Sequence, residues 1–334
     1  MTIRVAINGF GRIGRNILRA LFESNFRQHF ELCAINDLGC PETLAHLTRY
    51  DSVHGIFPYQ VSYHKDALHI DGQKIAFYSC AEAKKLPWRK NQIDLVFECT
   101  GRYTDGDKAR AHIDAGAHRV LISAPAPNVD ATIVYGVNHH LLTSDMQIIS
   151  NASCTTNCLA PVAKVLDSHF GIERGLMTTI HAYTNDQQLT DEASQDLYRA
   201  RAATQSIIPS KTGAAIAVGE VLPNLNGKLT GMAFRVPTIN VSVVDFQCVL
   251  TKTASKEDIN DAMDEASQGG LRGVMETSAL PLVSIDYNHH PASAVFDKNQ
   301  TLINENLVKV VAWYDNEWGF SNRMLDTGLA MMTC

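Results

Sequence analysis

The feature that most constrains the fold is a glycine-rich stretch near the start of the 334-residue chain. Residues 3–7 have the composition of a buried strand, and a helix-favouring run follows over residues 15–22. Between them, Gly9, Gly11 and Gly14 keep the spacing Gly-x-Gly-x-x-Gly. The first glycine permits a tight turn, the second lets a pyrophosphate approach the backbone, and the third allows close helix–strand packing. We therefore predict a dinucleotide-binding unit of the Rossmann type.

An acidic residue stands where the second strand of this unit should end. Residues 31–36 read as that strand, and Asp37 follows it, twenty-three positions after Gly14. A carboxylate at this distance accepts hydrogen bonds from an adenosine ribose and repels a 2′-phosphate. No arginine directly follows Asp37, so the sequence predicts NAD, not NADP, as the cofactor.

Strand-like and helical patterns alternate through the first half of the chain. Residues 93–99 and 119–122 resemble strands, and residues 107–115 resemble a helix between them. This alternation predicts a doubly wound parallel sheet covered by helices. Thr100 and Ser123 come directly after two of the strands, at the edge where open α/β sheets bind ligands. We expect both to line the nicotinamide side of the site.

The second half of the chain has a different pattern. Long runs rich in Val, Thr and Ser, separated by few helices, predict a mainly antiparallel sheet in an α+β domain. These runs cover residues 229–236, 240–250 and 307–313. Ser255 and Asp258 resemble a capping box that opens a helix through about residue 267, and residues 322–332 read as a terminal helix. The predicted fold class is therefore α/β, with two domains.

One cysteine lies among small hydrogen-bonding residues. Residues 150–158 read Ser-Asn-Ala-Ser-Cys-Thr-Thr-Asn-Cys, and a helix-favouring run follows them. Cys154 is thus expected near a helix N-terminus, where the macrodipole stabilises a thiolate. His181 ends a strand-like run, and an imidazole beside the thiol would lower its pKa and move protons. On spacing alone this pair is a weak signal, because such residues are commonly structural.

Composition excludes several classes of function. The formal net charge of −6 offers no basic stripe, so nucleic acid is not an expected partner. The eight cysteines lack metal-site spacing, which predicts no metal and fits a reducing cytosol. No run of eighteen apolar residues occurs, and Arg4 and Arg12 interrupt the N-terminal stretch. We expect a soluble cytoplasmic protein without a membrane partner.

Taken together, these motifs resemble the phosphorylating glyceraldehyde-3-phosphate dehydrogenases over essentially the whole chain. The matching segments are residues 8–14, 34–37, 150–158, 181–184, 212–215, 231–237 and 313–319. The resemblance implies NAD-dependent oxidation and phosphorylation of D-glyceraldehyde 3-phosphate to 1,3-bisphosphoglycerate, as in glycolysis and gluconeogenesis. It further implies a thiohemiacetal and a thioacyl-enzyme on Cys154, with His181 as general base.

The same resemblance assigns further residues and an architecture. The implied NAD contacts are Gly9, Gly11, Arg12, Ile13, Gly14, Asp37, Thr100, Ser123 and Asn316. The implied ligands of the substrate phosphate are Thr184, Asp186, Arg199 and Arg235, and those of the attacking phosphate are Ser153, Thr155, Thr212 and Gly213. The NAD-binding domain is expected to cover residues 1–151, joined by a C-terminal helix over 317–334, and the catalytic domain residues 152–316. A homotetramer is implied, with residues 183–206 buried between subunits.

Erythrose-4-phosphate dehydrogenase, a close relative, is the alternative. It gives 4-phosphoerythronate for pyridoxal phosphate synthesis, and it passes its thioester to water. Cys99 and residues 187–188, 205–209 and 281–286 resemble that enzyme. Thr184 and the intact Thr212-Gly213-Ala214-Ala215 resemble the triose enzyme, and an intact second anion site favours phosphate as the acceptor.

One departure from the family pattern concerns cofactor affinity, and two other classes of function also remain as hypotheses. Glu192 and Ala193 replace the Leu-Pro of many family members near the adenosine, so cofactor affinity is expected to differ from theirs. A thiol-redox or partner-binding protein that uses Cys154 on a nucleotide fold is a hypothesis from another class. It does not need the phosphate-binding residues, and a cysteine hydrolase needs neither the glycines nor Asp37.

Overall fold

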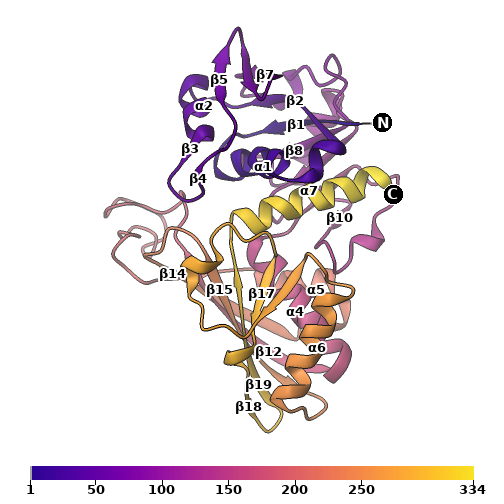
Figure 1. The fold of residues 1–334 in the computed structure, drawn as a ribbon, viewed down its shortest axis with the longest axis vertical. Helices are drawn as coiled ribbons and strands as arrows, with labels where there is room; N and C mark the ends of the chain where they lie inside the picture. Colours follow the sequence, from indigo (N-terminus) through magenta and orange to yellow (C-terminus); the bar gives the residue numbers. More distant parts are fainter. Residues whose placement is uncertain (1) are drawn as a thin grey trace. The chain divides into compact units, whose positions relative to one another are not determined.

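The structure is a computed structural model that describes residues 2–334 (Figure 1). The chain divides into two compact units. The first contains the residues up to Ile133, then His139–Ala152 and Ser321–Cys334, and the second contains Val134–Asn138 and Ser153–Phe320.

A nine-stranded sheet forms the centre of the first unit, within residues 2–334. Its order is β10-β11-β9-β8-β1-β2-β7-β6-β5. All pairs from β10 to β7 are parallel, and β6 pairs antiparallel with both β7 and β5. The strands are β1 Ile3–Asn8, β2 Phe30–Asn36, β5 Val61–His64, β6 Ala67–Ile70, β7 Gln73–Tyr78, β8 Leu95–Glu98, β9 Arg119–Ile122, β10 Ala131–Thr132 and β11 Ile148–Ser150. A separate short pair joins β3 Tyr50–Asp51 to β4 Gly55–Ile56.

Helices cover this parallel sheet. They are α1 Arg12–Glu23, α2 Pro41–Arg49, α3 Gly106–Asp114 and the part of α7 Trp318–Thr333 that starts at Ser321. Ala109 of α3 packs on Val120 and Ile122 of β9. On α7, Gly328 lies so close to Phe97 of β8 that a Cβ would be 3.0 Å from that ring. These contacts bury the central strands on both faces, as a parallel sheet requires.

The second unit is built on an eight-stranded sheet, again within the described residues. Its order is β13-β14-β12-β15-β19-β17-β16, with β18 paired to β19. Only β12 with β14 and β16 with β17 are parallel, so the expected mainly antiparallel sheet is confirmed. The strands are β12 Ile172–Ala182, β13 Ile208–Lys211, β14 Leu229–Val236, β15 Ser242–Leu250, β16 Met275–Ser278, β17 Ala294–Asp297, β18 Leu302–Asn304 and β19 Leu307–Tyr314.

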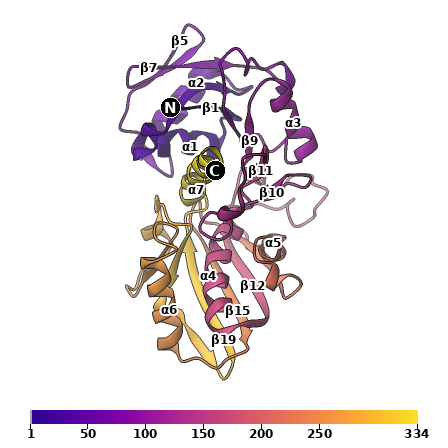
Figure 2. The same cartoon turned by 90° about the vertical axis from the view of Figure 1, so that its right-hand side faces the viewer.

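Two helices, α4 Cys154–Phe170 and α6 Lys256–Gln268, pack side by side on one face of this sheet (Figure 2). A third, α5 Ala214–Val221, packs on α4 and β14. The capping box predicted for α6 is confirmed, because Ser255 Oγ accepts from the Asp258 amide and Asp258 accepts from the Ser255 amide. Short 3₁₀ turns cover Asn25–Gln28, Ala83–Lys85, His139–Leu141, Pro223–Leu225, Ser284–Tyr287 and Lys298–Gln300.

The division of the chain differs from the predicted boundaries by a few residues at 152 and at 317–320, and in one internal segment. Residues 134–138, expected in the nucleotide-binding half, belong to the second unit. The reason is local, since Lys164 of α4 donates to the carbonyls of Gly136 and Val137 at 2.9 and 3.1 Å. Gly136 also lies against Val274, whose side chain would be 3.0 Å from a Cβ at that position.

Candidate active site

The turn between β1 and α1 requires glycines. Gly9 has a φ of +91°, and a Cβ there would lie 2.6 Å from the backbone of Cys99. A Cβ on Gly14 would lie 2.1 Å from the Gly9 carbonyl oxygen. Gly11 is the N-cap of α1 and has open space where a Cβ would be. The backbone at Gly11 is therefore accessible at a helix N-terminus, where anions are stabilised.

Asp37 is tied to the glycine turn. It follows β2, and its Oδ2 accepts from the Phe10 amide at 2.6 Å, while its Oδ1 accepts from the Gly39 amide at 2.7 Å. Each carboxylate oxygen keeps a further lone pair for a hydroxyl donor. The carboxylate is thus fixed at the carboxyl edge of the sheet.

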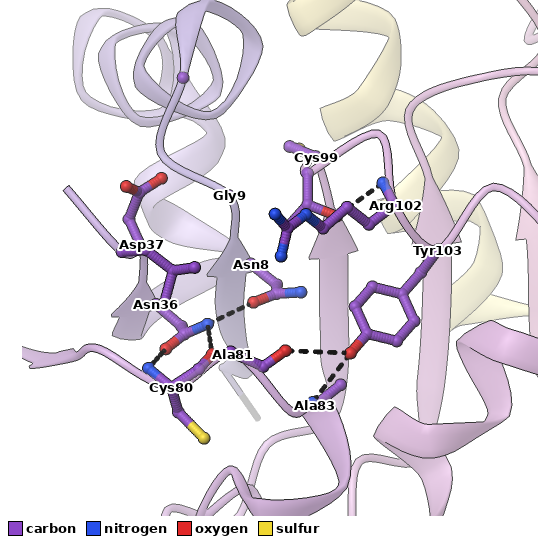
Figure 3. A pocket seen from close by; sticks show the side chains of 13 residues that line it. Asn8, Gly9, Asn36, Asp37, Cys80, Ala81, Ala83, Cys99, Arg102 and Tyr103 are labelled. Carbon is purple, nitrogen blue, oxygen red and sulfur yellow. Dashed lines mark hydrogen bonds between the residues drawn. The ribbon is translucent and has the colours of Figure 1, made fainter.

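These residues border a cavity of about 270 Å³ (Figure 3). Its lining comes from the last residues of β1 and β2 and from the loops after β1, β2, β7 and β8. The lining residues are Asn8, Gly9, Gly11, Asn36, Asp37, Leu38, Cys80, Ala81, Ala83, Cys99, Thr100, Arg102 and Tyr103. Figure 3 shows Asn8 and Asn36 hydrogen-bonded to each other, with Nδ2 of Asn36 donating to Oδ1 of Asn8 at 2.7 Å.

A buried carboxylate holds one wall of the cavity. Glu98, at the end of β8, accepts from the Thr100 amide at 2.7 Å and from the Thr100 hydroxyl at 2.5 Å. Its other oxygen accepts from Asn8 Nδ2 at 2.5 Å and lies 2.9 Å from His112 Nε2. Trp88 Nε1 donates to His112 Nδ1, so the ring proton is on Nε2 and is donated to Glu98. The loop that carries Thr100 is thereby fixed.

Four of the NAD contacts expected from the sequence line the cavity, namely Gly9, Gly11, Asp37 and Thr100. Within the same unit, four others lie outside its lining: Arg12, Ile13, Gly14 and Ser123. Gly14 supports the turn, as described above. The Ser123 amide donates to the Glu98 carbonyl at 3.0 Å.

Arg12 is engaged by an acidic partner. Its two terminal nitrogens donate to Asp51 of β3 at 2.5 and 3.2 Å. Burial raises the pKa of Asp51, but the bonds from Arg12 and from the amides of His54 and Val53 outweigh it and lower that pKa to about 2. The ion pair therefore fixes Arg12 in the first turn of α1.

Several lining residues could not be predicted from the sequence alone, or were not. Asn8 and Asn36 are the last residues of β1 and β2, and their position at the carboxyl end of a strand was a usable signal. Arg102, Tyr103 and Cys80 had no such signal. Tyr103 is placed by its hydroxyl, which accepts from the Ala83 amide at 3.0 Å.

In the second unit, Cys154 is the first residue of α4, as predicted. Ser153 is the N-cap, and its Oγ accepts from the Thr156 amide at 3.0 Å. Ala152 adopts a φ of +55°, in the left-handed region, which turns the chain sharply from β11 into the helix. The thiol therefore lies at the positive end of the helix dipole.

His181 of β12 lies beside this thiol, with Nε2 3.5 Å from Sγ of Cys154. Its Nδ1 is 2.6 Å from the Ala182 carbonyl oxygen and 2.8 Å from Nη1 of Arg235. Nδ1 cannot both donate a proton to the Ala182 carbonyl and accept one from Arg235. Two lone pairs at 2.6 Å would repel, whereas Arg235 has another acceptor in the same carbonyl at 3.0 Å. We assign the proton to Nδ1, which leaves the Nε2 lone pair facing Cys154.

Burial and charge keep this pair neutral. Burial, reinforced by the Arg235 guanidinium, lowers the pKa of His181 to about 3. Burial also raises the pKa of the Cys154 thiol, and the charge of Arg235 and hydrogen bonds from Thr155 only partly oppose it. The imidazole at neutral pH is thus a proton acceptor, not a cation that stabilises a thiolate.

A buried tyrosine joins the elements that carry the pair. Tyr314, at the end of β19, bonds through its hydroxyl to Thr155 Oγ1 at 2.8 Å and to Thr179 Oγ1 at 2.9 Å. Its ring meets that of His181 edge to face, with centroids 5.9 Å apart. The Thr155 hydroxyl therefore has one bond to Tyr314, and the network ties α4 to β12 and β19.

The predicted substrate-phosphate ligands form one cluster. Arg235 Nη1 lies 3.3 Å from Thr184 Oγ1, and Thr184 donates in turn to Asp186. Arg199 forms an ion pair with the same carboxylate. Burial raises the pKa of Asp186, but the bond from Thr184 and the charges of Arg235 and Arg199 outweigh it and hold that pKa below its usual value.

The residues predicted for the second phosphate meet through Thr156. Ser153 Oγ is 2.8 Å from Thr156 Oγ1, and Thr156 Oγ1 donates to the Ala214 carbonyl at 3.3 Å. Gly213 is the N-cap of α5, and the Ala214 amide donates to Thr212 Oγ1 at 3.1 Å. Two helix N-termini, those of α4 and α5, are thus joined at this point.

Asn316 lies in the turn between β19 and α7. Its Oδ1 accepts from the Ser242 hydroxyl at 2.8 Å.

No group of three or more His, Cys, Asp or Glu side chains within residues 2–334 is arranged to hold a metal ion. Over the same residues, no helix combines the length and apolar character needed to cross a membrane.

Comparison with known protein families identifies both units. The model of the glyceraldehyde 3-phosphate dehydrogenase NAD-binding domain matches residues 3–106, and that of the C-terminal domain of the same family matches residues 153–316. A glyceraldehyde-3-phosphate dehydrogenase of Pseudomonas aeruginosa is 57% identical over 331 residues, which are 99% of this chain and 98% of the relative. The plasmid and chromosomal enzymes of Cupriavidus necator are each 55% identical over 332 residues, 99% of both chains.

Proposed function

Because the chain belongs to the glyceraldehyde-3-phosphate dehydrogenase family, we propose that it oxidises and phosphorylates D-glyceraldehyde 3-phosphate to 1,3-bisphosphoglycerate with NAD. The observation that carries the proposal is the contact of 3.5 Å between Cys154 Sγ and His181 Nε2. Two clusters of residues that we assign to phosphate binding lie nearby, one at Arg235 beside His181 and one at Ser153 beside Cys154. The relatives carry the triose name, so the erythrose-4-phosphate alternative is not favoured.

The cavity at β1 and β2 suits the adenosine half of NAD. Gly11 leaves space for a pyrophosphate at the α1 N-terminus, and Asp37 presents its carboxylate beside that space. We assign Gly9, Gly14 and Arg12 to shaping this turn, and Thr100, Ile13 and Ser123 to the surroundings of the bound cofactor. When bound, NAD supplies the hydride acceptor.

The acylation step begins at the thiol. As Sγ of Cys154 bonds to the aldehyde carbon, its proton moves to His181 Nε2 and then to the new alkoxide oxygen, giving a thiohemiacetal. The Cys154 amide, at the start of α4, stabilises charge on that oxygen. His181 then accepts the hydroxyl proton while the C–H bond breaks and its electron pair leaves as hydride. A thioester on Cys154 remains.

Phosphate completes the reaction. An oxygen of inorganic phosphate bonds to the thioester carbon, the C–S bond breaks, and the Cys154 thiolate recovers a proton from His181. We propose that Ser153, the Thr155 amide, Thr212 and Gly213 hold this phosphate, and that Thr184 and Arg235, supported by Asp186 and Arg199, hold the substrate phosphate. The aldehyde is oxidised by two electrons and the acyl group leaves as a mixed anhydride.

We also propose a homotetramer in the cytoplasm. Residues 183–207 form neither helix nor strand, and they expose large apolar side chains. These are Leu189, Leu197, Tyr198 and Ile207. An apolar loop of this kind is expected to be covered by other subunits. All eight cysteines are unbridged, which suits a reducing compartment.

Steady-state kinetics test the proposed substrate. Purified protein is given D-glyceraldehyde 3-phosphate or D-erythrose 4-phosphate with NAD and inorganic phosphate, and NADH is followed. We expect a kcat/KM at least tenfold higher for the triose, because the anion sites and the thiol then match one short substrate. A higher kcat/KM for the tetrose would overturn the assignment.

A further inference from the structure

The side-chain amide of Asn316 has a hydrogen-bond partner for its oxygen, Oδ1, but none for its nitrogen, Nδ2, among the described residues. Ser242 donates to Oδ1 at 2.8 Å, whereas no residue within 2–334 accepts a hydrogen bond from Nδ2. The side chain is 5% exposed, and Nδ2 is not among the enclosed atoms that lack a partner. An unoccupied amide donor therefore faces out of a mostly buried side chain.

The direction of the Ser242 bond is fixed by a second contact. The Ala182 amide donates to Ser242 Oγ at 3.0 Å, and Ser242 is 1% exposed. The hydroxyl proton needs an acceptor, and Asn316 Oδ1 is the acceptor that the described residues provide. If the amide were flipped, this buried hydroxyl would have no acceptor. Ser242 thus selects the amide orientation in which Nδ2 points outward.

The backbone that carries Asn316 is fixed independently. Asp315, 1% exposed, accepts from Asn240 Nδ2 at 2.8 Å and from the amide of His289 at 2.7 Å. Its other oxygen accepts from the amides of Glu317 and Trp318 at 2.9 and 2.7 Å. The turn is therefore held by Asp315, and the orientation of the amide is left to Ser242.

Ser242 also touches the strand that carries the base. It is the first residue of β15 and pairs with Tyr314 of β19, while its hydroxyl receives the amide of the residue that follows His181. One hydroxyl thus connects β12, which bears His181, to the turn that bears Asn316.

We propose that Ser242 is a positioning residue that fixes Asn316 as a hydrogen-bond donor toward the carboxamide oxygen of NAD. The inference rests on the proposed function, within which we assign Asn316, an NAD contact implied by the family resemblance, to the nicotinamide carboxamide. A donor with a fixed orientation holds the nicotinamide carboxamide in one orientation. The nicotinamide ring then presents one particular face to the thiol site. Without the serine hydroxyl, the amide is free to rotate and offer its oxygen instead.

Calorimetric binding of NAD and of ADP-ribose to the full-length protein tests this role. ADP-ribose lacks the nicotinamide, so a general structural defect weakens both ligands, whereas a lost amide orientation weakens NAD alone. For Ser242→Ala we expect NAD to bind about three- to tenfold more weakly, with ADP-ribose within about twofold of wild type. Ser242→Thr, which keeps the hydroxyl, should restore the wild-type ratio of the Kd for NAD to the Kd for ADP-ribose.

A matched control and a second variant complete the test. Ser293→Ala removes another buried hydroxyl of the same unit, one that has no hydrogen-bond partner among the described residues. This variant should change the affinity for neither NAD nor ADP-ribose. Ser242→Cys has nearly the volume of serine and donates poorly, so it should behave as the alanine variant even if that variant does not fold. The position of deuterium in NADH made from a deuterated aldehyde gives a further readout, with transfer to both ring faces expected in the variants.

A double variant separates this inference from the proposed function. The Asn316→Asp side chain still accepts from Ser242 but cannot donate a hydrogen bond. We therefore expect this variant to bind NAD more weakly relative to ADP-ribose. Adding Ser242→Ala to it should weaken NAD binding no further. Equal weakening of NAD and ADP-ribose in Ser242→Ala, or none, would overturn the role of Ser242. If Asn316→Asp itself leaves NAD binding unchanged, the assignment of Asn316 to the nicotinamide fails instead.

Discussion

At the scale of single residues, the ring of His181 determines what the thiol site can do. Its Nδ1 proton is held by the Ala182 carbonyl, and its Nε2 lone pair faces Cys154. Because its pKa is lowered to about 3, the ring enters the reaction neutral and accepts protons. Its chemical role in the proposed mechanism is therefore that of a base while the aldehyde is oxidised, and of a proton donor to Cys154 when phosphate releases the acyl group.

Replacing His181 with asparagine should separate chemistry from binding. An asparagine amide fills similar space but cannot accept a proton at neutral pH, so kcat should fall about 10²- to 10⁴-fold while the Kd for NAD stays unchanged. Pre-steady-state NADH formation and NAD calorimetry measure the two quantities. A kcat within threefold of wild type would show that another group is the base.

Asp37 should determine which nicotinamide cofactor is used. Its carboxylate is held by the amides of Phe10 and Gly39 and borders the cavity, where it would repel a 2′-phosphate. In Asp37→Gly we expect the ratio of kcat/KM for NAD to that for NADP to fall at least tenfold. Glu42→Gln, an exposed acidic change in the helix that follows, is the control and should leave the ratio unchanged. An unchanged ratio in Asp37→Gly would remove the role given to this residue.

At the scale of elements, helix α1 and strand β3 are held together by the pair of Arg12 and Asp51. The folded pKa of Asp51 is about 2, below its ordinary 3.8. The pair thus stabilises the fold above pH 3.8, and this contribution is lost as the pH falls toward 2. A shift of this size corresponds to about 2 kcal/mol, and the Asp51 side chain is only 3% exposed.

Asp51→Asn should therefore lower the free energy of unfolding by about 2 kcal/mol at pH 7 and by much less at pH 2.5. Asp71→Asn, which breaks the exposed pair with Arg27, is the matched control and should change stability little at either pH. Denaturant unfolding at the two pH values checks both. Equal destabilisation by Asp51→Asn at both pH values would contradict the pH dependence.

The N-terminus of α6 offers a second test at this scale. Ser255 and Asp258 cap it reciprocally, so Ser255→Ala should destabilise the second unit by about 1 kcal/mol. Ser267→Ala, in the last turn, removes a bond to the Asp264 carbonyl within the same helix and should cost less. Comparable losses from both variants would contradict the importance of the cap.

Elements with strong local signals could be predicted from the sequence. Residues 119–122, 229–236 and 307–313 form β9, β14 and most of β19, because each segment is rich in apolar residues. The antiparallel strands β5 and β6 had no usable signal, since they are short and interrupted by polar residues. Their place in the sheet follows from pairing with β7, which local sequence does not encode.

At the scale of the whole molecule, the motifs proposed to bind ligands could be identified from the sequence, but the contacts between distant segments could not. Cys154 and the glycines belong to continuous motifs, so their positions followed from the sequence. Arg235 lies beside His181 because β12 and β14 pair in register, a relation across fifty-four residues. The bonds from Tyr314 to Thr155 and from Ser242 to Asn316 likewise depend on tertiary packing.

In the proposed mechanism, Cys154 forms a thioester from which phosphate releases the acyl group. We would mix stoichiometric enzyme, NAD and D-glyceraldehyde 3-phosphate without inorganic phosphate, follow NADH, and examine the protein by intact mass spectrometry. Cys154→Ser serves as the control that binds NAD but cannot be acylated. We expect about one NADH per active site, an acyl group on Cys154, and steady turnover only after phosphate is added. Sustained NADH formation without phosphate, or an acyl group that phosphate does not discharge, would contradict this mechanism.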